Sequence, residues 1–164
     1  MSHLVPPVHE VEEVAFLLAQ PETSSGTLRL VVKDVWRCGP GELAHQSAYH
    51  IALTDKTKAA LIKRAHDAGC AVIEAHSHVG DSPAEFSHSD HSGFEEFVPH
   101  IRWRLKGLPY AAIVVTRQDM DGFVWSGQAT TPERLGGIEV DGSVSVRSNR
   151  RSSLTWRPTI NERF

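Results

Sequence analysis

The chain has 164 residues, of which 40% are hydrophobic, and a formal net charge of −3 at pH 7. These values favour one ordinary globular domain and argue against nucleic acid as the main partner. No apolar run is long enough to span a membrane and the first residues lack the pattern of a signal peptide, so we expect a cytoplasmic protein with no membrane partner. The two cysteines, Cys38 and Cys70, are expected to be free thiols.

Short apolar or alternating runs bounded by turn residues predict six strands. They cover residues 14–20, 27–37, 48–53, 70–75, 110–116 and 123–127. The last two strands flank the segment 118–122, whose sequence Gln-Asp-Met-Asp-Gly is typical of a hairpin.

Two helices are expected between these strands. Thr54 can cap the start of the first helix, which should run to about residue 66, and Gly69 should end it. Ala60, Leu61 and Ala65 should face the core. The second helix should cover about residues 90–105, with a kink or a break at Pro99. Strands and helices in this order predict an α/β fold with a mixed central sheet and helices on its faces.

Beyond residue 128 the regular patterns weaken. Residues 138–146 can form a hairpin around an Asp-Gly pair, and the arginines in 147–151 stand among serines, which is typical of a solvated linker. We therefore expect a main domain at residues 1–128, followed at 129–164 by a C-terminal hairpin and a linker-like tail.

Two histidines and an aspartate are candidate metal ligands. His76 and His78 follow the expected strand at 70–75, and since side chains at i and i+2 share one face of a strand, both imidazoles should point the same way. Asp90 comes at the expected start of the second helix, three residues after Ser87. Two imidazoles and one carboxylate can hold zinc and leave one position for water, which is the composition of a catalytic site. Both Ser87 and Asp90 are also good helix-capping residues, which is their alternative role.

His-Ser-His at residues 76–78, a loop, and Ser-x-x-Asp at residues 87–90 together resemble the JAMM motif of the MPN-plus zinc metallopeptidases. The resemblance covers roughly residues 8–127. It implies the MPN fold, which is cytidine-deaminase-like, and one Zn2+ ion per chain held by the two histidines and the aspartate.

The loop before the aspartate is one residue longer than is usual in that family. Eleven residues, 79–89, separate His78 from Asp90. Because this insertion can change which side chain reaches the metal, His88 and His91 stay open as alternative ligands.

The resemblance also implies a glutamate ahead of the first strand that moves a proton during catalysis, and Glu13 matches it by its position before the apolar run. A solvated surface glutamate is the alternative, and Glu12 is expected to be one. Ser87 is implied as a hydrogen-bond donor to the oxyanion that develops during hydrolysis. Glu74 shares the strand face of the histidines and is expected either to orient one of them or to be a paired structural carboxylate.

The implied function is that of a zinc-dependent peptidase or isopeptidase that cleaves at the C-terminus of a ubiquitin-like protein, using water activated by the metal. Its implied partners are a ubiquitin-like protein or peptide as substrate and an E1-like adenylating domain. Two alternatives stay open. One is a non-catalytic MPN scaffold that binds other proteins, and the other is a zinc hydrolase of a small amide or cysteine-derived metabolite.

Overall fold

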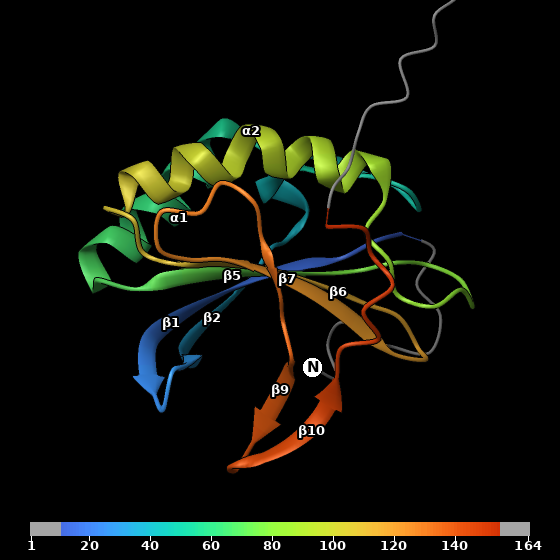
Figure 1. The fold of residues 1–164 in the computed structure, drawn as a ribbon. Coiled ribbons are helices and arrows are strands. Elements are labelled where there is room, and N and C mark those ends of the chain that lie inside the picture. The colour runs from blue at the N-terminus through green and yellow to red at the C-terminus, as the bar shows by residue number, and fades with distance from the viewer. Residues whose placement is uncertain (1–10, 155–164) are drawn as a thin grey trace, which may run out of the picture.

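A mixed sheet of six strands forms the centre of the computed structural model, which describes residues 11–154 (Figure 1). The strands lie in the order β2-β1-β5-β6-β7-β8, in which β5 and β6 are parallel and the other neighbours are antiparallel. Their bounds are β1 Val14–Ser24, β2 Thr27–Arg37, β5 Ala71–Ser77, β6 Tyr110–Val115, β7 Met120–Trp125 and β8 Glu133–Arg134. The expected α/β class with a mixed sheet is confirmed.

A separate sheet of two strands lies outside this main sheet. It pairs β3, Leu43–Gln46, with β4, Ile51–Leu53, and a single turn of 3-10 helix, η1, covers Pro40–Glu42 before it. The strand predicted at 48–53 is therefore shorter than expected, and β3 has no counterpart in the prediction. Ser47 N donates to His50 O over 2.9 Å, so the residues between the two strands form a tight turn instead of extending β4.

The first helix, α1, covers Asp55–Ala68. It begins after Thr54 and ends before Gly69 as predicted, two residues beyond the expected end at about residue 66. Thr54 Oγ1 accepts a hydrogen bond from Thr57 N over 3.1 Å, and Gly69 adopts a left-handed conformation with φ of 62° that is easiest for glycine. Ala60 is exposed, so its predicted place in the core is wrong. Leu61 and Ala65 are buried as predicted, and Thr57 and Ile62 complete the buried side of the helix.

The second helix, α2, covers His88–Arg104 and continues through Pro99 instead of breaking there. Pro99 is exposed, while Phe94, Val98 and Ile101 on the opposite side are buried against the sheet, and this packing holds the helix together across the missing hydrogen bond. Among residues 11–154, no helix is both long enough and apolar enough to cross a membrane.

Both helices cover the same face of the sheet, where most of the large buried side chains lie (Figure 1). The opposite face of the sheet carries smaller buried side chains. It is partly covered by the hairpin of β9, Gly137–Val140, and β10, Ser143–Arg147. Ile138 and Val146 of this hairpin pack against buried residues of the sheet. The hairpin predicted at 138–146 is confirmed. Within residues 11–154, both helices lie on one face of the sheet instead of being divided between its two faces.

The segment after β10 is part of the folded body. Ser152 is fully buried and Asn149 is half-buried, and both bond to groups of the main domain. The solvated linker predicted for residues 147–151 is therefore wrong within the described range. The rest of the predicted tail, residues 155–164, lies outside the residues that the structure describes.

Candidate metal centre

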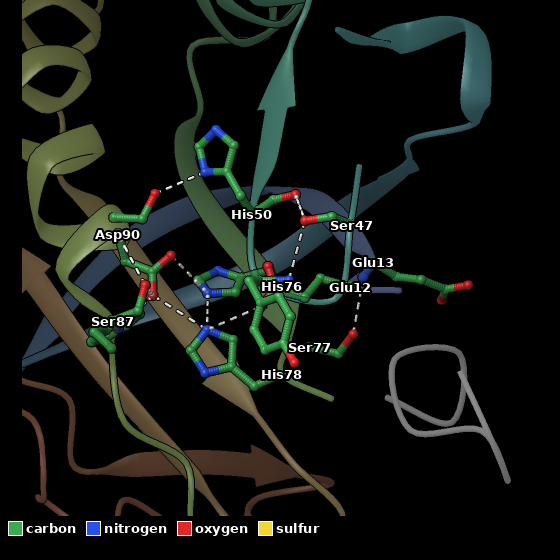
Figure 2. Close-up of polar contacts among 12 residues, drawn as sticks. Glu12, Glu13, Ser47, His50, His76, Ser77, His78, Ser87 and Asp90 are labelled. Carbon is green, nitrogen blue, oxygen red and sulfur yellow. Dashed lines mark hydrogen bonds and ion pairs between the residues drawn. The ribbon is translucent and has the colours of Figure 1, made fainter. Parts of the chain in front are cut away.

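His76 and His78 reach the same point in space from the end of β5. His76 lies between β1 and β6 in the sheet, and only 3% of it is exposed. His78 follows the strand, and its N–H donates to Val115 O of β6 over 3.0 Å. The ring centroids are 5.1 Å apart and the two Nε2 atoms are 3.3 Å apart (Figure 2). The shared orientation predicted for the two imidazoles is present.

Asp90 joins the histidines from the first turn of α2. Ser87 Oγ accepts from Asp90 N over 3.2 Å, and Asp90 Oδ2 accepts from Ser87 N over 2.7 Å, which is the reciprocal arrangement of a capping box. Such a cap stabilises a helix by about 0.5–2 kcal/mol. The same carboxylate also faces both imidazoles, so the capping role and the position of a ligand are combined in one residue.

The spacing of the donor atoms suits a tetrahedral metal ion. Asp90 Oδ1 is 3.3 Å from His76 Nε2, and Asp90 Oδ2 is 3.2 Å from His78 Nε2. Donor atoms about 2.0–2.1 Å from a tetrahedral zinc ion lie about 3.3–3.4 Å from one another. The three residues therefore form a group that could hold a metal ion without rearrangement of the backbone.

Negative charge surrounds the two imidazoles. Burial by itself lowers the pKa of His76, but the carboxylates of Asp90 and Glu74 outweigh it and raise that pKa to about 10. Burial would raise the pKa of Asp90, yet His76 and His78 bring it well below its usual range. The cluster thus favours a positive charge between the histidines and the aspartate, and a divalent cation could supply that charge.

Glu12, and not Glu13, is the glutamate ahead of β1 that lies at this cluster. Glu12 is only 5% exposed, and its Oε1 is 3.7 Å from His78 Nε2. The side chain of Glu13 extends away from the histidines in Figure 2, while its N–H donates to Ser77 Oγ over 3.0 Å. The expectation that Glu13 faces the site and that Glu12 is a surface residue is wrong.

The register between β1 and β5 explains the exchange. Val14 pairs directly with His76, and paired residues of neighbouring strands point to the same face. Glu12 lies two residues before Val14, so its side chain points to the same face as those of Val14 and His76. The side chain of Glu13 points to the opposite face. Burial raises the pKa of the Glu12 carboxyl group above its usual value.

Glu74 and Tyr110 form a chain of contacts behind His76. Glu74 Oε1 is 3.4 Å from His76 Nδ1, and Tyr110 Oη donates to Glu74 Oε2 over 2.5 Å. Burial and the adjacent carboxylate keep the pKa of Tyr110 well above its usual value, so the phenol stays a hydrogen-bond donor. Contact at Nδ1 leaves Nε2 of His76 directed at the cluster, which supports the orienting role expected of Glu74. Tyr110 was predicted only as the first residue of the strand 110–116.

Glu74→Gln and Tyr110→Phe should each weaken zinc binding by about 10–100-fold, because partners that orient a ligating histidine usually contribute this much. Competition with a chromophoric chelator would measure the dissociation constant. Glu95→Gln, a change at an exposed carboxylate of α2, serves as the control and should leave zinc affinity at the wild-type value. Unchanged affinity in both of the first two variants would show that the contact does not orient His76.

Ser87 contacts the site through Asp90. Its Oγ donates to Asp90 Oδ2 over 2.8 Å, which fixes the orientation of the carboxylate. The predicted contact of Ser87 with an oxyanion stays a prediction.

His88 and His91 do not belong to the cluster. Within residues 11–154, the group able to hold a metal comprises His76, His78 and Asp90. His88 is exposed, and the ring of His91 packs against Phe86 and Phe123 at centroid distances of 6.3 and 6.0 Å. The extra loop residue has thus left the start of α2 in register with the two histidines.

A pocket of about 740 Å³ opens beside the cluster, between α1, α2 and β4. Glu12, His76 and Asp90 form part of its wall. The apolar part of the wall includes Val14, Phe16, Ile51, Leu53, Ile62, Phe94 and Phe97. The rest of the wall carries polar and charged side chains, including Asp55, Lys58 and Glu96. A concave pocket in which polar groups converge beside an apolar wall is a candidate ligand-binding site.

Neither a scan against models of protein families nor a search of curated proteins finds a match for this chain.

Proposed function

We propose that this protein is a zinc-dependent hydrolase of amide bonds, with the JAMM motif as its metal site and the MPN fold as its scaffold. The observation that carries the proposal is the convergence of His76, His78 and Asp90, with Glu12 beside them, at the wall of a pocket. Three protein ligands leave one coordination position open, as in catalytic zinc sites, whereas structural sites are closed by a fourth protein ligand.

Each residue of the site has a distinct role in this proposal. His76, His78 and Asp90 would hold the zinc ion, which when bound supplies activated water near neutral pH and polarises a carbonyl. Glu12 accepts the proton of the attacking water and returns it to the leaving amine, because it is the carboxylate nearest to His78 that is not itself a candidate ligand. Glu74 orients His76 and Ser87 orients Asp90.

The proposed substrate is a peptide or isopeptide bond at the C-terminus of a ubiquitin-like protein, and the proposed partner is an E1-like adenylating domain. Both proposals rest on the motif. The pocket between α1, α2 and β4 supports them, because it offers an apolar wall on which an extended chain can lie while its carbonyl group reaches the cluster. We propose the cytoplasm as the place of action.

Protein purified without a chelator should contain about one equivalent of zinc per chain, since the three donor groups are already spaced for it. Elemental analysis measures this content. Dialysis against a chelator should remove the zinc, and adding zinc afterwards should restore the content. Zinc addition should also raise the melting temperature, because a ligand that binds the folded state stabilises it. Less than about a tenth of an equivalent with no uptake on adding zinc would contradict the proposed site.

Cleavage by the zinc-loaded protein separates the proposed function from its alternatives. Incubation with ubiquitin-like proteins that carry a C-terminal extension should release the extension, detected by mass spectrometry, and chelation should stop the release. Hydrolysis of small acyl-amino acid amides alone would point to a metabolite hydrolase. Zinc binding without hydrolysis of either substrate would favour the scaffold.

A further inference from the structure

The end of the loop between His78 and Ser87 is held by side chains that come from the turn between β6 and β7 and from the segment after β10. Ala84 N donates to Asp119 Oδ1 over 2.6 Å, and Asn149 Nδ2 donates to Ala84 O over 2.7 Å. Two residues later, Phe86 N donates to Ser152 Oγ over 2.9 Å. We call residues 148–152 the C-terminal clasp.

The clasp is itself anchored to the start of β7 by the buried carboxylate of Asp121. One oxygen of this carboxylate accepts from Ser148 Oγ over 2.6 Å and from Gly122 N over 2.8 Å. The other accepts from Ser152 N over 2.7 Å. Asn149 adds a bond from its Nδ2 to Asp119 Oδ2 over 2.8 Å. Each clasp residue whose side chain bonds to the loop therefore makes a second contact, Asn149 through its side chain and Ser152 through its backbone N–H.

This network lies in the interior. Asp121, Ser152 and Ala84 are all 0% exposed, and Phe86 is 5% exposed. A buried polar group that loses its partner typically costs about 1–3 kcal/mol, so these bonds strongly favour one position of the loop over others. An ordinary surface linker, as residues 147–151 were expected to be, has no such penalty.

The held loop leads directly into the candidate metal centre. The ring of Phe86 packs against His76 at a centroid distance of 5.9 Å and against Phe94 of α2 at 5.1 Å. The next residue is Ser87, whose N–H and hydroxyl both bond to Asp90. A shift of Phe86 would therefore move one ligand through packing and another through the helix cap.

We propose that Asn149 and Ser152 of the C-terminal clasp are positioning residues for the metal centre, holding the loop 79–86 so that Asp90 meets His76 and His78 at metal-binding distance. The inference rests on the proposed zinc site. It makes the segment that follows the β9–β10 hairpin a working part of that site, although it lies about sixty residues further along the chain than Asp90.

Two single variants and one matched control test the inference in the full chain. Asn149→Ala and Ser152→Ala each remove one side chain that bonds to the loop, and Ser145→Ala removes an exposed hydroxyl of β10 that does not. Zinc affinity is measured by chelator competition at a temperature where thermal unfolding shows every metal-free variant to be folded. We expect about 10–100-fold weaker zinc binding in the two clasp variants and wild-type affinity in the control.

A second measurement reports on the loop without any metal. Hydrogen exchange of the metal-free protein should be faster across residues 79–91 in Asn149→Ala and Ser152→Ala than in wild type, and unchanged in Ser145→Ala. Unchanged exchange in both clasp variants would overturn the clasp, whether or not the wild-type protein binds zinc. A lower melting temperature with wild-type zinc affinity would also overturn it, because the segment would then stabilise the fold without positioning the ligands. If wild type takes up no zinc, the proposed function fails, and the exchange experiment still decides on the clasp.

Discussion

Glu12→Gln should lower the rate of amide hydrolysis by about 10²–10⁴-fold, which is the usual contribution of general acid–base catalysis. The variant should keep its fold and its zinc. Glu12 is buried beside His78 and is not among the three candidate ligands. Glutamine keeps the shape of the side chain but cannot take up the proton of the attacking water. Single-turnover kinetics of the zinc-loaded variant on a cleavable ubiquitin-like fusion would measure the loss.

Glu13→Gln is the matched control, since it makes the same chemical change one residue later. Its side chain extends away from the histidines, so this variant should hydrolyse the substrate at the wild-type rate with the wild-type zinc content (Figure 2). A dead Glu13→Gln enzyme beside an active Glu12→Gln enzyme would contradict both the register of β1 against β5 and the role assigned to Glu12.

Asp90→Asn should abolish zinc retention, leaving less than about a tenth of an equivalent per chain after dialysis, because a neutral amide is a much poorer zinc ligand than a carboxylate. Asparagine retains a side-chain oxygen that can accept from Ser87 N and so preserves the start of α2. Elemental analysis measures the zinc, and circular dichroism checks the helix. Asp90→Ala should lose the zinc as well and should also destabilise the helix.

His88→Ala and His91→Ala provide the comparison for Asp90. His88 is exposed and the ring of His91 packs among aromatic side chains, so both variants should keep about one equivalent of zinc. His91→Ala should cost stability through lost packing without losing the metal. Zinc loss in either histidine variant, with retention in Asp90→Asn, would mean that the extra loop residue has changed the ligand set.

The amino-acid sequence by itself determined the features that depend on residues close together in the chain. The alternation of side chains along a strand places His76 and His78 on one face. The capping box formed by Ser87 and Asp90 defines the start of α2. Thr54 begins α1 and Gly69 ends it because a cap satisfies backbone groups only a few residues away. Three candidate ligands could therefore be named from local patterns, together with the α/β class.

Only the tertiary structure decided which glutamate faces the ligands. The choice between Glu12 and Glu13 depends on Val14 pairing with His76, and a shift of one residue in that register exchanges the two faces of the strand. Placing both helices on one face depended in the same way on how distant elements pack.

The clasp and the contact of Tyr110 with Glu74 show the same limit. Asp121 belongs to β7 and is buried. The turn between β6 and β7 lies earlier in the chain than the predicted segment 118–122, since Thr116 N donates to Asp119 O over 3.0 Å. The pair Asp121-Gly122 is a local pattern that predicts a turn, but it carries no information about the groups from residues 148–152 that bond to the Asp121 carboxylate. Contacts between segments far apart in the chain leave no periodic signal in either segment, so these parts of the site appear only once the sheet has assembled.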